Sequence, residues 1–237
     1  MKWSEWQPLY NGIVSELGLN PEEDRRATQI LSSILIGRNS SLLLQELRVL
    51  IRERIVVVCG AGPSLKNHLE RIERQELTER LTFIAADGAT SALLEEGIQV
   101  DIIVTDLDGD LGDIKNAIKQ GAIPIVHAHG DNMHIVEDFL PSLKTVIGST
   151  QVEPQPNVFL WGGFTDGDRG CYLATHYKPA KLVLAGMDFG HVVGKWSKPE
   201  YIDHIRAPEK KRKKLEIAQR LLGHLWETTD VKYEIMR

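Results

Sequence analysis

The sequence predicts an α/β protein whose mostly parallel sheet is covered by helices on both faces. From residue 54 onwards, short apolar runs recur, and most of them are continuous rather than interrupted by polar residues. Continuous apolar runs are typical of strands buried on both faces of a parallel sheet. Stretches with helical periodicity separate several of these runs, and this alternation indicates right-handed crossover connections between parallel strands.

The predicted strands are the apolar runs at 55–58, 81–84, 101–104, 123–126, 144–147, 158–160 and 182–184, with a last strand near 231–235. The predicted helices lie near 64–77, 89–96, 111–119, 132–140 and 168–177, and a long charged helix is expected near 207–226. Together these elements define one α/β domain over residues 53–237.

Residues 1–52 lack this alternation and are expected to form a helical segment that packs on the α/β domain. Asn20 is a typical helix N-cap, and Pro21 suits the first position of a helix. Apolar residues follow at helical spacing until Gly37, which suits a helix end. A second helix is expected from about Asn39. No pattern typical of catalysis is found in this segment.

The composition is that of a soluble globular protein, because 42% of the 237 residues are hydrophobic and 26% are charged. No apolar run approaches the roughly 18 residues that a membrane span needs. The N-terminus has no apolar stretch of an export signal, and Cys59 and Cys171 have no metal-binding or redox spacing. We therefore expect a cytoplasmic protein without a membrane partner. A net charge of −5 and a pI of about 5.9 argue against nucleic acid as a partner.

Residues that can bind ligands gather where the predicted strands end. The first strand runs into a glycine turn with Gly60, Gly62 and Ser64, whose backbone N–H groups can hold a phosphate at the start of a helix. Later strands end in the segments Asp87–Gly88, Asp106–Asp110, His127–Asn132 and Trp161–Arg169. In an open α/β sheet, ligands bind beyond the carboxyl ends of the strands, so we expect the active site there.

The acidic cluster of Asp106, Asp108 and Asp110 is the most informative of these segments. Its three carboxylates repel one another, and no Lys or Arg stands among them. A divalent cation relieves such repulsion, and Mg²⁺ binds one or two carboxylates together with waters and substrate phosphates. A calcium loop is excluded because its twelfth position would be Ala117 rather than glutamate. The cluster therefore predicts a metal–phosphate site in preference to a solvated acidic turn.

The glycine turn after the first strand also has a second interpretation. Gly60 and Gly62 could begin a dinucleotide-binding turn with Asp87 as the ribose ligand, which would suit a nicotinamide- or flavin-dependent oxidoreductase. However, the third glycine of that fingerprint is replaced by Leu65, and this function leaves the acidic cluster without a purpose. The oxidoreductase is therefore kept as an alternative of lower rank.

Five segments together resemble the archaeal 6-hydroxymethyl-7,8-dihydropterin diphosphokinase family. In chain order they are Gly60–Leu65, Ala86–Ala89, Asp101–Asp110, His127–Asn132 and Gly186–Gly190. The resemblance extends from about residue 54 to the basic helix after residue 207. It implies a Rossmann-like fold of the thiamine-diphosphokinase type, with ATP as cosubstrate, Mg²⁺ as cofactor, a pterin alcohol as acceptor and AMP as the second product.

Thiamine diphosphokinase is a more distant likeness. Its Ala-Asp-Gly-Gly-Ala-Asn and Gly-Asp-x-Asp-Ser segments correspond to Ala86–Thr90 and Thr105–Gly109 of this chain. These departures favour the pterin, and thiamine stays the alternative acceptor. A non-catalytic nucleotide-binding module, of the kind that occurs inside larger proteins that modify surface structures, is a further alternative.

The resemblance implies roles for the residues at the strand ends. Asp106 and Asp108 would be the metal carboxylates, and Asp131 with Asp166 or Asp168 would complete the metal–triphosphate site or orient the acceptor hydroxyl. The predicted catalytic residues are Asp106, Asp108, Asp131, Asp168 and Arg169, and the first three are also the predicted metal ligands. The predicted nucleotide-binding residues are Gly60, Gly62, Ser64, Asp87, Gly88, Lys211 and Lys214.

The phosphate-binding cations expected in such a site come from two segments. They are Arg169 and one or more of Lys210, Lys211, Lys213 and Lys214. The lysine run can equally be a solvated helix face. Trp161 and Phe164 are candidates for stacking on a flat ring, with packing as the alternative role. The sequence leaves a homo-oligomer open.

Overall fold

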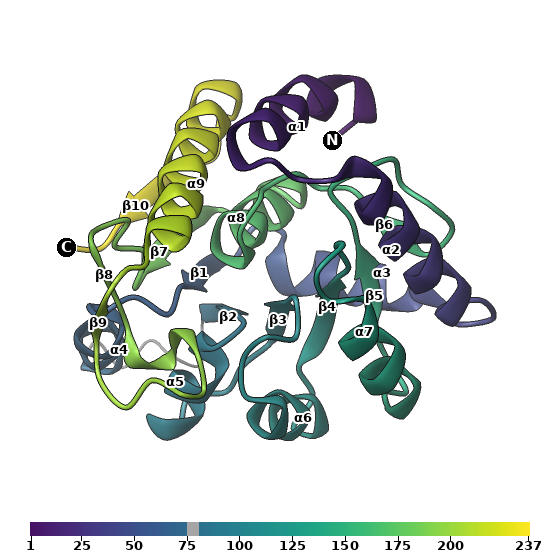
Figure 1. Cartoon of the computed structure of the whole chain (residues 1–237). Helices are drawn as coiled ribbons and strands as arrows, with labels where there is room; N and C mark the ends of the chain where they lie inside the picture. The colour runs from purple at the N-terminus through teal and green to yellow at the C-terminus, as the bar shows by residue number, and fades with distance from the viewer. Residues whose placement is uncertain (75–80) are drawn as a thin grey trace.

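A parallel sheet forms the centre of the computed structural model, which describes residues 1–74 and 81–237 (Figure 1). Its strand order is β10-β7-β1-β2-β3-β4-β5-β6, and every neighbouring pair is parallel. The strands are β1 (Ile55–Cys59), β2 (Leu81–Ala86), β3 (Ile102–Thr105), β4 (Ile123–His127), β5 (Ile147–Ser149), β6 (Val158–Phe159), β7 (Lys181–Ala185) and β10 (Tyr233–Ile235). The predicted strands are confirmed, although β5 begins only at the end of the predicted run.

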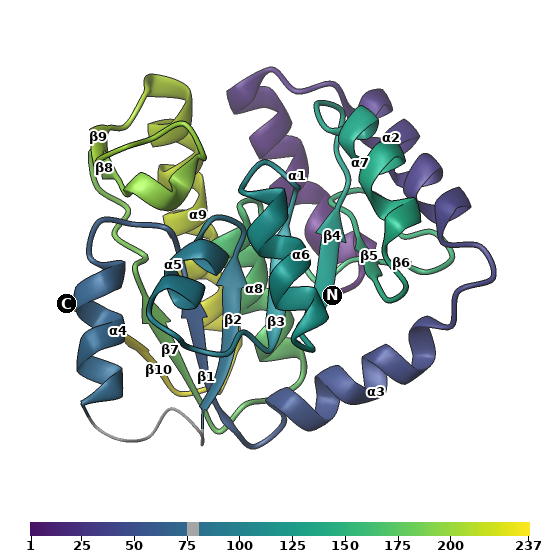
Figure 2. The same cartoon turned by 90° about the horizontal axis from the view of Figure 1, so that it is seen from below.

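Helices cover both faces of this sheet, as the sequence predicts (Figures 1 and 2). One apolar layer contains buried residues of α1 (Trp3–Leu17), α3 (Ser40–Ile51), α8 (Asp166–His176) and α9 (Glu209–Thr228). The other contains buried residues of α2 (Pro21–Ile34), α4 (Leu65–Glu73), α5 (Ala89–Glu95), α6 (Leu111–Lys119) and α7 (Met133–Phe139). The predicted helix near 64–77 corresponds to α4, and its residues 75–77 lie outside the described residues. Within residues 1–74 and 81–237, no helix combines the length and apolar character needed to cross a membrane.

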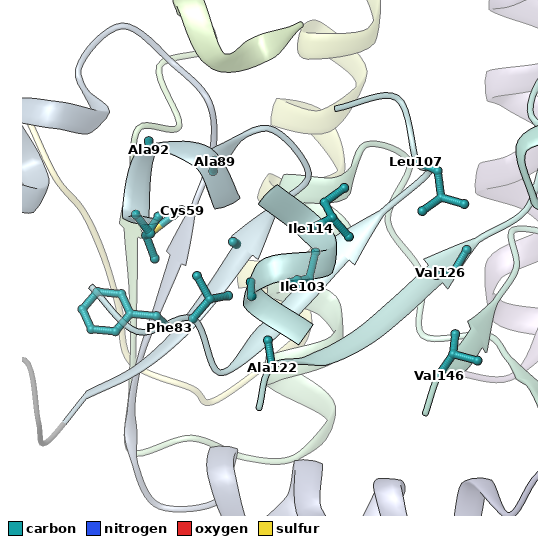
Figure 3. Close-up of a cluster of buried hydrophobic side chains, with 14 of the residues drawn as sticks. Cys59, Phe83, Ala89, Ala92, Ile103, Leu107, Ile114, Ala122, Val126 and Val146 are labelled. Carbon is teal, nitrogen blue, oxygen red and sulfur yellow. The ribbon is translucent and has the colours of Figure 1, made fainter. Parts of the chain in front are cut away.

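Neighbouring residues of a strand belong to opposite layers, which explains the continuous apolar runs. In β1, Val56 and Val58 lie in the layer of α8 and α9, whereas Val57 and Cys59 lie in the layer of α4 and α5. All four are buried. Figure 3 shows the second layer, in which Phe83 of β2 lies beside Cys59. A strand whose two faces are both covered has no position left for an exposed polar side chain.

Between β7 and α9 the chain forms a two-stranded antiparallel ribbon that the sequence does not predict. Its strands are β8 (Val192–Val193) and β9 (Ile205–Arg206). Two residues per strand are too few to show the period-two pattern by which strands are recognised. The loop of the ribbon contains the 3₁₀ helix η3 (Lys195–Ser197), and this loop reaches the cavity described below.

The helices of residues 1–52 pack into both apolar layers of the sheet. Trp6 of α1 is fully buried, and its indole N–H donates to the backbone carbonyl of Gln151 at 2.9 Å. The same ring meets Tyr172 of α8 edge-on, with 6.2 Å between the ring centroids. Helix α2 contributes Ala27 and Leu31 to the opposite layer. The turn between α1 and α2 is therefore held in a fixed place against the α/β domain.

Replacing Trp6 with alanine should lower the free energy of unfolding by about 3–5 kcal/mol, because a buried aromatic ring and its hydrogen bond are lost. Trp3→Ala is the matched control, since Trp3 is only half-buried and its loss should cost clearly less. Urea unfolding followed by circular dichroism measures both values. Equal losses for the two variants would contradict the assignment of Trp6 to the core.

Candidate active site

A cavity of about 710 Å³ lies where the strands of the parallel sheet end. The segments that follow β1, β2, β3, β4 and β7 line it, together with the beginning of α8. The first turns of α9 and the turn between α1 and α2 complete its wall. This volume is typical of small-molecule sites, and the position is the one expected from the topology of the sheet.

Three carboxylates of the cavity wall lie close enough together to hold one cation. Asp87 follows β2, and Asp106 and Asp108 follow β3; one oxygen atom from each lies within 4.8 Å of the others. Asp106 Oδ1 is buried and has no hydrogen-bond partner in the described parts of the chain. Leaving a buried carboxylate oxygen unsatisfied costs free energy, and a divalent cation that prefers oxygen ligands would satisfy it. The donor set therefore fits an ion such as Mg²⁺.

A hydroxyl group and a glycine fix the positions of these carboxylates. The Thr105 hydroxyl donates to Asp87 and accepts the N–H of Leu107 at 2.7 Å. Leu107, which separates the other two aspartates, has a left-handed φ of 68°, a conformation that is unfavourable for a residue with a side chain. A Cβ atom at Gly109 would lie 2.6 Å from Asp87 Oδ2, so this position requires glycine.

Burial and mutual repulsion raise the pKa values of two carboxylates of the site, whereas neighbouring cationic groups lower that of a third. Burial, and then the charge of Asp166, raises the pKa of Asp87 well above its ordinary value. Burial, and then the charge of Asp106, likewise raises the pKa of Asp166 at the start of α8. Burial acts against ionisation of Asp106 too, but the hydrogen bond and charge of His129 outweigh it and lower the pKa of Asp106 to about 2. Negative charge is therefore favoured on Asp106 over Asp87 and Asp166.

Two residues of the loop after β4 hold Asp106 in place. His129 Nε2 lies 3.2 Å from Asp106 Oδ2. The side-chain amide of Asn132 donates to the backbone carbonyls of Asp106 and His127, each at 2.8 Å, and its oxygen accepts the N–H of His129 at 2.9 Å. The sequence motif indicates this loop but not its contacts with Asp106, because the residues that make these contacts are far apart along the chain.

The predicted lysine run of α9 divides between two faces of the helix. Lys210, Lys211 and Lys214 line the cavity. Lys213 instead pairs with Glu209, at 3.2 Å between Nζ and Oε1. Ammonium groups that gather in one wall of a cavity are suited to bind phosphate oxygens.

Lys198 is a further cation of the site, and no pattern in the sequence points to it. It follows η3 in the ribbon loop, lines the cavity and forms an ion pair with Asp108. No Lys or Arg lies within the acidic cluster along the chain, but the fold brings this one from a position 90 residues further on. The acidic cluster is therefore partly neutralised by the protein itself.

Asp131 does not belong to the group of three carboxylates. Its side chain is 75% exposed, and its Oδ2 lies 4.0 Å from Nζ of Lys210. It lines the cavity, but Asp87, which the sequence suggests as a nucleotide-binding residue, occupies the third position beside Asp106 and Asp108.

Asp168, for which the sequence predicts a catalytic role, stabilises the start of α8 in this structure. Its carboxylate accepts the backbone N–H groups of Phe164 and Thr165, both at 2.7 Å, in a capping box whose N-cap is Thr165. Arg169 is fully buried and is not among the described residues that line the cavity. Its Nη2 donates to the carbonyl oxygen of Phe164 at 3.1 Å. Asp166 is the carboxylate of α8 that faces the cavity.

The backbone N–H groups of the glycine turn after β1 are already used within the protein. Those of Gly60 and Gly62 donate to carbonyl oxygens at and just after the end of β7, each at 2.9 Å. That of Ser64 donates to the carboxylate of Asp188 at 3.1 Å. Asp188 thus takes the anion position before α4, and this corrects the prediction that these three groups hold a phosphate. Gly60, Gly62 and Gly88 nevertheless line the cavity.

Of the two aromatic residues considered for stacking, Phe164 lines the cavity, whereas Trp161 is buried in the core. Lys214 Nζ lies 5.9 Å from the centroid of the Phe164 ring. Trp161 packs on Phe159, with 5.6 Å between the ring centroids. Phe164 therefore stays a candidate for contact with a flat ligand.

The N-terminal segment supplies a wall of the cavity that no sequence pattern indicates. Buried Asp24 of α2 lines it. Its Oδ1 accepts the N–H of Gly130 at 2.9 Å, and its Oδ2 accepts the hydroxyl of Tyr10 at 2.6 Å and the side-chain amide of Gln151 at 2.7 Å. In the sequence, Asp24 is one of three acidic residues in a first helical turn, so nothing local distinguishes it from its neighbours.

The chain is similar to a family model and to curated archaeal proteins. The model described as "6-hydroxymethylpterin diphosphokinase MptE-like" matches residues 33–194. A protein of Pyrococcus furiosus named 6-hydroxymethyl-7,8-dihydropterin pyrophosphokinase is 47% identical, over 95% of this chain and 94% of its own length. Proteins of the same name from Methanocaldococcus jannaschii and Methanothermobacter thermautotrophicus are 41% and 42% identical, over 98% and 99% of this chain and 99% of their own lengths.

A solved structure with a similar fold is the MAf glycosyltransferase from Magnetospirillum magneticum AMB-1. The TM-score is 0.51 at 16% sequence identity, and the match covers 78% of this chain and 34% of that one. This chain therefore spans about a third of the length of that structure. At such low identity the likeness concerns the fold alone, and it agrees with the predicted α/β class.

Asp87→Asn should stabilise the protein in the absence of divalent cations, by on the order of 1–2 kcal/mol at pH 8. The folded state raises the pKa of Asp87, so ionising this carboxylate costs stability as the pH rises above the range in which an unfolded Asp titrates. The difference in free energy of unfolding between variant and wild type should therefore grow from pH 5 to pH 8.

Chemical unfolding at several pH values, with and without Mg²⁺, measures this difference. Asp138→Asn, on the exposed surface of α7, is the control and should show no pH-dependent difference from wild type. Mg²⁺ should stabilise the wild type more than Asp87→Asn. A variant that is less stable than wild type at pH 8 without metal would contradict the inferred repulsion.

Proposed function

The chain belongs to the MptE-like family of 6-hydroxymethylpterin diphosphokinases, and we propose that it transfers the β,γ-diphosphate of ATP to 6-hydroxymethyl-7,8-dihydropterin and releases AMP. The observation that carries this proposal is that one cavity combines the carboxylates of Asp87, Asp106 and Asp108 with the lysines of α9. Carboxylates that can hold a divalent cation and lysines that can bind phosphate oxygens are the groups that such a transfer needs.

Asp87, Asp106 and Asp108 would hold the Mg²⁺ ion. When bound, Mg²⁺ neutralises phosphate charge and orients the phosphate chain. The lowered pKa of Asp106 leaves it ionised at neutral pH, so this carboxylate is ready to accept a cation. Asp87 would give up its proton when the positive charge of the ion arrives, because a nearby cation favours the ionised form of a carboxyl group.

The lysines of the cavity would bind and orient the triphosphate. Lys211 and Lys214 lie in the first turns of α9 and line the cavity. Lys198 forms an ion pair with Asp108 in the absence of ligands, and a cation at Asp108 would free Lys198 to contact a phosphate oxygen. Because phosphoryl transfer depends mainly on positioning and charge neutralisation, these groups need no covalent step of their own.

The acceptor hydroxyl needs a group that takes its proton as its oxygen attacks the β-phosphorus. A bond forms between that oxygen and the β-phosphorus, while the bond between the β-phosphorus and the oxygen shared with the α-phosphorus breaks, so that AMP leaves. Asp166 lines the cavity, and a cation held by the neighbouring carboxylates would favour its ionised form. Because burial raises its pKa, the ionised carboxylate is then suited to accept the proton. Arg169 would act indirectly, since its buried charge opposes that rise.

The alternatives from the sequence gain no support. A dinucleotide-dependent oxidoreductase would need the turn after β1 to hold a pyrophosphate, but the N–H groups of Gly60, Gly62 and Ser64 are used within the protein. The three curated relatives are named as pterin enzymes, and their names mention neither thiamine nor a non-catalytic role.

The nucleotide product should be AMP, with no ADP formed in step with the phosphorylated acceptor. This outcome follows from attack at the β-phosphorus, which transfers two phosphates together. Anion-exchange chromatography of a reaction with ATP, Mg²⁺ and the reduced pterin alcohol measures both nucleotides. ADP in an amount equal to the product would indicate transfer of a single phosphate and would refute the proposed reaction.

Asp106→Asn and Asp108→Asn should each lower kcat by about 100-fold or more, because one charged interaction made in the transition state is worth roughly 3 kcal/mol. Both variants should fold, since the amide keeps the size of the side chain. Asp138→Asn removes an exposed carboxylate of α7 and should leave kcat unchanged. Steady-state measurement of AMP formation compares the three, and near-normal turnover by both site variants would exclude them as metal ligands.

A further inference from the structure

The cavity extends from the carboxylate group in two directions along the sheet. Asp87 and Asp106 follow the central strands β2 and β3, whereas the remaining loops follow β1 and β7 on one side and β4 and β5 on the other. On the β4–β5 side the wall contains Leu19, Asp24, His127, Gly130 and Gln151. We call these five residues the β4–β5 arm. Two of its members, Leu19 and Asp24, come from the N-terminal segment, which supplies none of the residues that would bind metal or phosphate in the proposed function.

His127 brings an unused polar atom to this arm. Its side chain is 2% exposed and lines the cavity. Nδ1 lies 3.3 Å from the hydroxyl of Ser149, but Nε2 has no hydrogen-bond partner within residues 1–74 and 81–237. A buried ring nitrogen without a partner is costly to a folded protein. A ligand in the cavity that offers a hydrogen-bonding group would remove this cost.

Gln151 brings a second polar atom, whose orientation is fixed by Asp24. A carboxylate can only accept hydrogen bonds, so the Gln151 amide nitrogen must face Asp24 Oδ2, which lies 2.7 Å away. The amide oxygen is left as an acceptor, and its interaction with the imidazole of His127 acts to raise the pKa of that ring, against the larger effects of burial and of Arg169. Asp24 itself accepts two further hydrogen bonds, from Tyr10 and Gly130. Its carboxylate therefore links α1, the loop after β4 and Gln151.

We propose that the β4–β5 arm is the binding site for the ring of the acceptor, and that His127 and Gln151 bind the hydrogen-bonding edge of that ring. This inference rests on the proposed function. A pterin presents amino, ring N–H and carbonyl groups along one edge, and neighbouring donors and acceptors in a buried wall match such an edge. Asp24 is then a positioning residue, which acts through Gln151 and the loop at Gly130.

The position of the arm also directs the reacting group of the acceptor. His127 and His129 lie in the same loop, with 5.9 Å between their ring centroids, and His129 contacts Asp106. A ring held beside His127 therefore has the carboxylate group as its neighbour, where its hydroxymethyl substituent is needed. The nucleotide would then take the side of β1 and β7, which is lined by Phe189, Val192 and Tyr201 among others.

Charge near the arm favours an uncharged ring over a cationic one. Burial, and then the charge of Arg169, lowers the pKa of His127 well below its ordinary value, so this imidazole stays neutral. Arg169 is itself buried and would repel a fixed positive charge placed beside His127. The carboxylate of Asp24 is already engaged in three hydrogen bonds. A neutral pterin therefore suits the arm better than the thiazolium of thiamine.

Kinetics of two arm variants test the assignment. Gln151→Leu removes the proposed acceptor atom, and Leu19→Trp narrows the arm from the half-buried α1–α2 turn without removing a buried hydrogen bond. Each should raise the KM for 6-hydroxymethyl-7,8-dihydropterin by about tenfold or more, while the KM for ATP changes less than about twofold. Gln155→Leu, the same change at an exposed position, should leave both values unaltered. Circular dichroism verifies folding, and Leu19→Trp remains informative if Gln151→Leu is unstable.

The possible failures can be told apart. A raised KM for ATP with an unchanged KM for the pterin would place the nucleotide in this arm and overturn the inference, while the proposed reaction would stand. Unchanged values for both substrates in folded Leu19→Trp would overturn it as well. Absence of AMP formation by the wild type with the pterin alcohol would refute the proposed function, and the inference with it.

Discussion

Repulsion between the carboxylates at the ends of β2 and β3 is the constraint on which the rest of the site depends. Asp87, Asp106 and Asp108 lie within reach of one cation, and a fourth carboxylate, Asp166, raises the cost of ionising Asp87. The fold compensates with groups from distant segments: His129 after β4, Lys198 in the ribbon and the lysines of α9. This compensation is incomplete, because one oxygen of Asp106 stays unsatisfied among the described residues. A ligand that brings positive charge relieves this repulsion, and its binding therefore stabilises the folded protein.

Acidic residues around the cavity divide into two kinds according to what their oxygens contact. Asp168 and Asp188 accept backbone N–H groups at the starts of α8 and α4, where the exposed N–H groups of a helix attract an anion. These two carboxylates are satisfied by the protein and fix the helices against the strand ends. Asp87, Asp106, Asp108 and Asp166 also line the cavity, but they accept no backbone N–H group from the described residues and are left for a ligand. Counting aspartates near a strand end does not separate the two kinds, whereas their backbone contacts do.

The parts of this structure that the sequence predicts are those that depend on local patterns. Continuous apolar runs identify the strands because both faces of the sheet are covered. Of the three aspartates within five residues, Asp106 and Asp108 lie in the carboxylate group, whereas Asp110 caps α6. The spacing of Asp168 from Thr165 is that of a capping box, so the helix-capping contact of Asp168 can also be read from the sequence. Lys198 and Gln151 could not have been found, because their roles arise from contacts with residues 90 and 127 positions away. The contacts of the glycine turn could not have been found for the same reason, since they are made with carbonyl oxygens at and just after the end of β7 and with Asp188.

The division of the site explains why a helical segment without catalytic residues is built into the core. In the proposed reaction the carboxylates and lysines would bind the diphosphate and its cation, which are the same for any acceptor, so the choice of acceptor would come from another wall. In the N-terminal wall, Tyr10 donates to Asp24 at every physiological pH, because burial and then the Asp24 hydrogen bond raise the pKa of Tyr10. Asp24 in turn fixes the amide of Gln151, so the hydroxyl, the carboxylate and the amide form one connected chain of hydrogen bonds in this wall. Trp6 holds the same helix against the backbone of Gln151, and the packing of α1 is thereby coupled to the geometry of the acceptor wall.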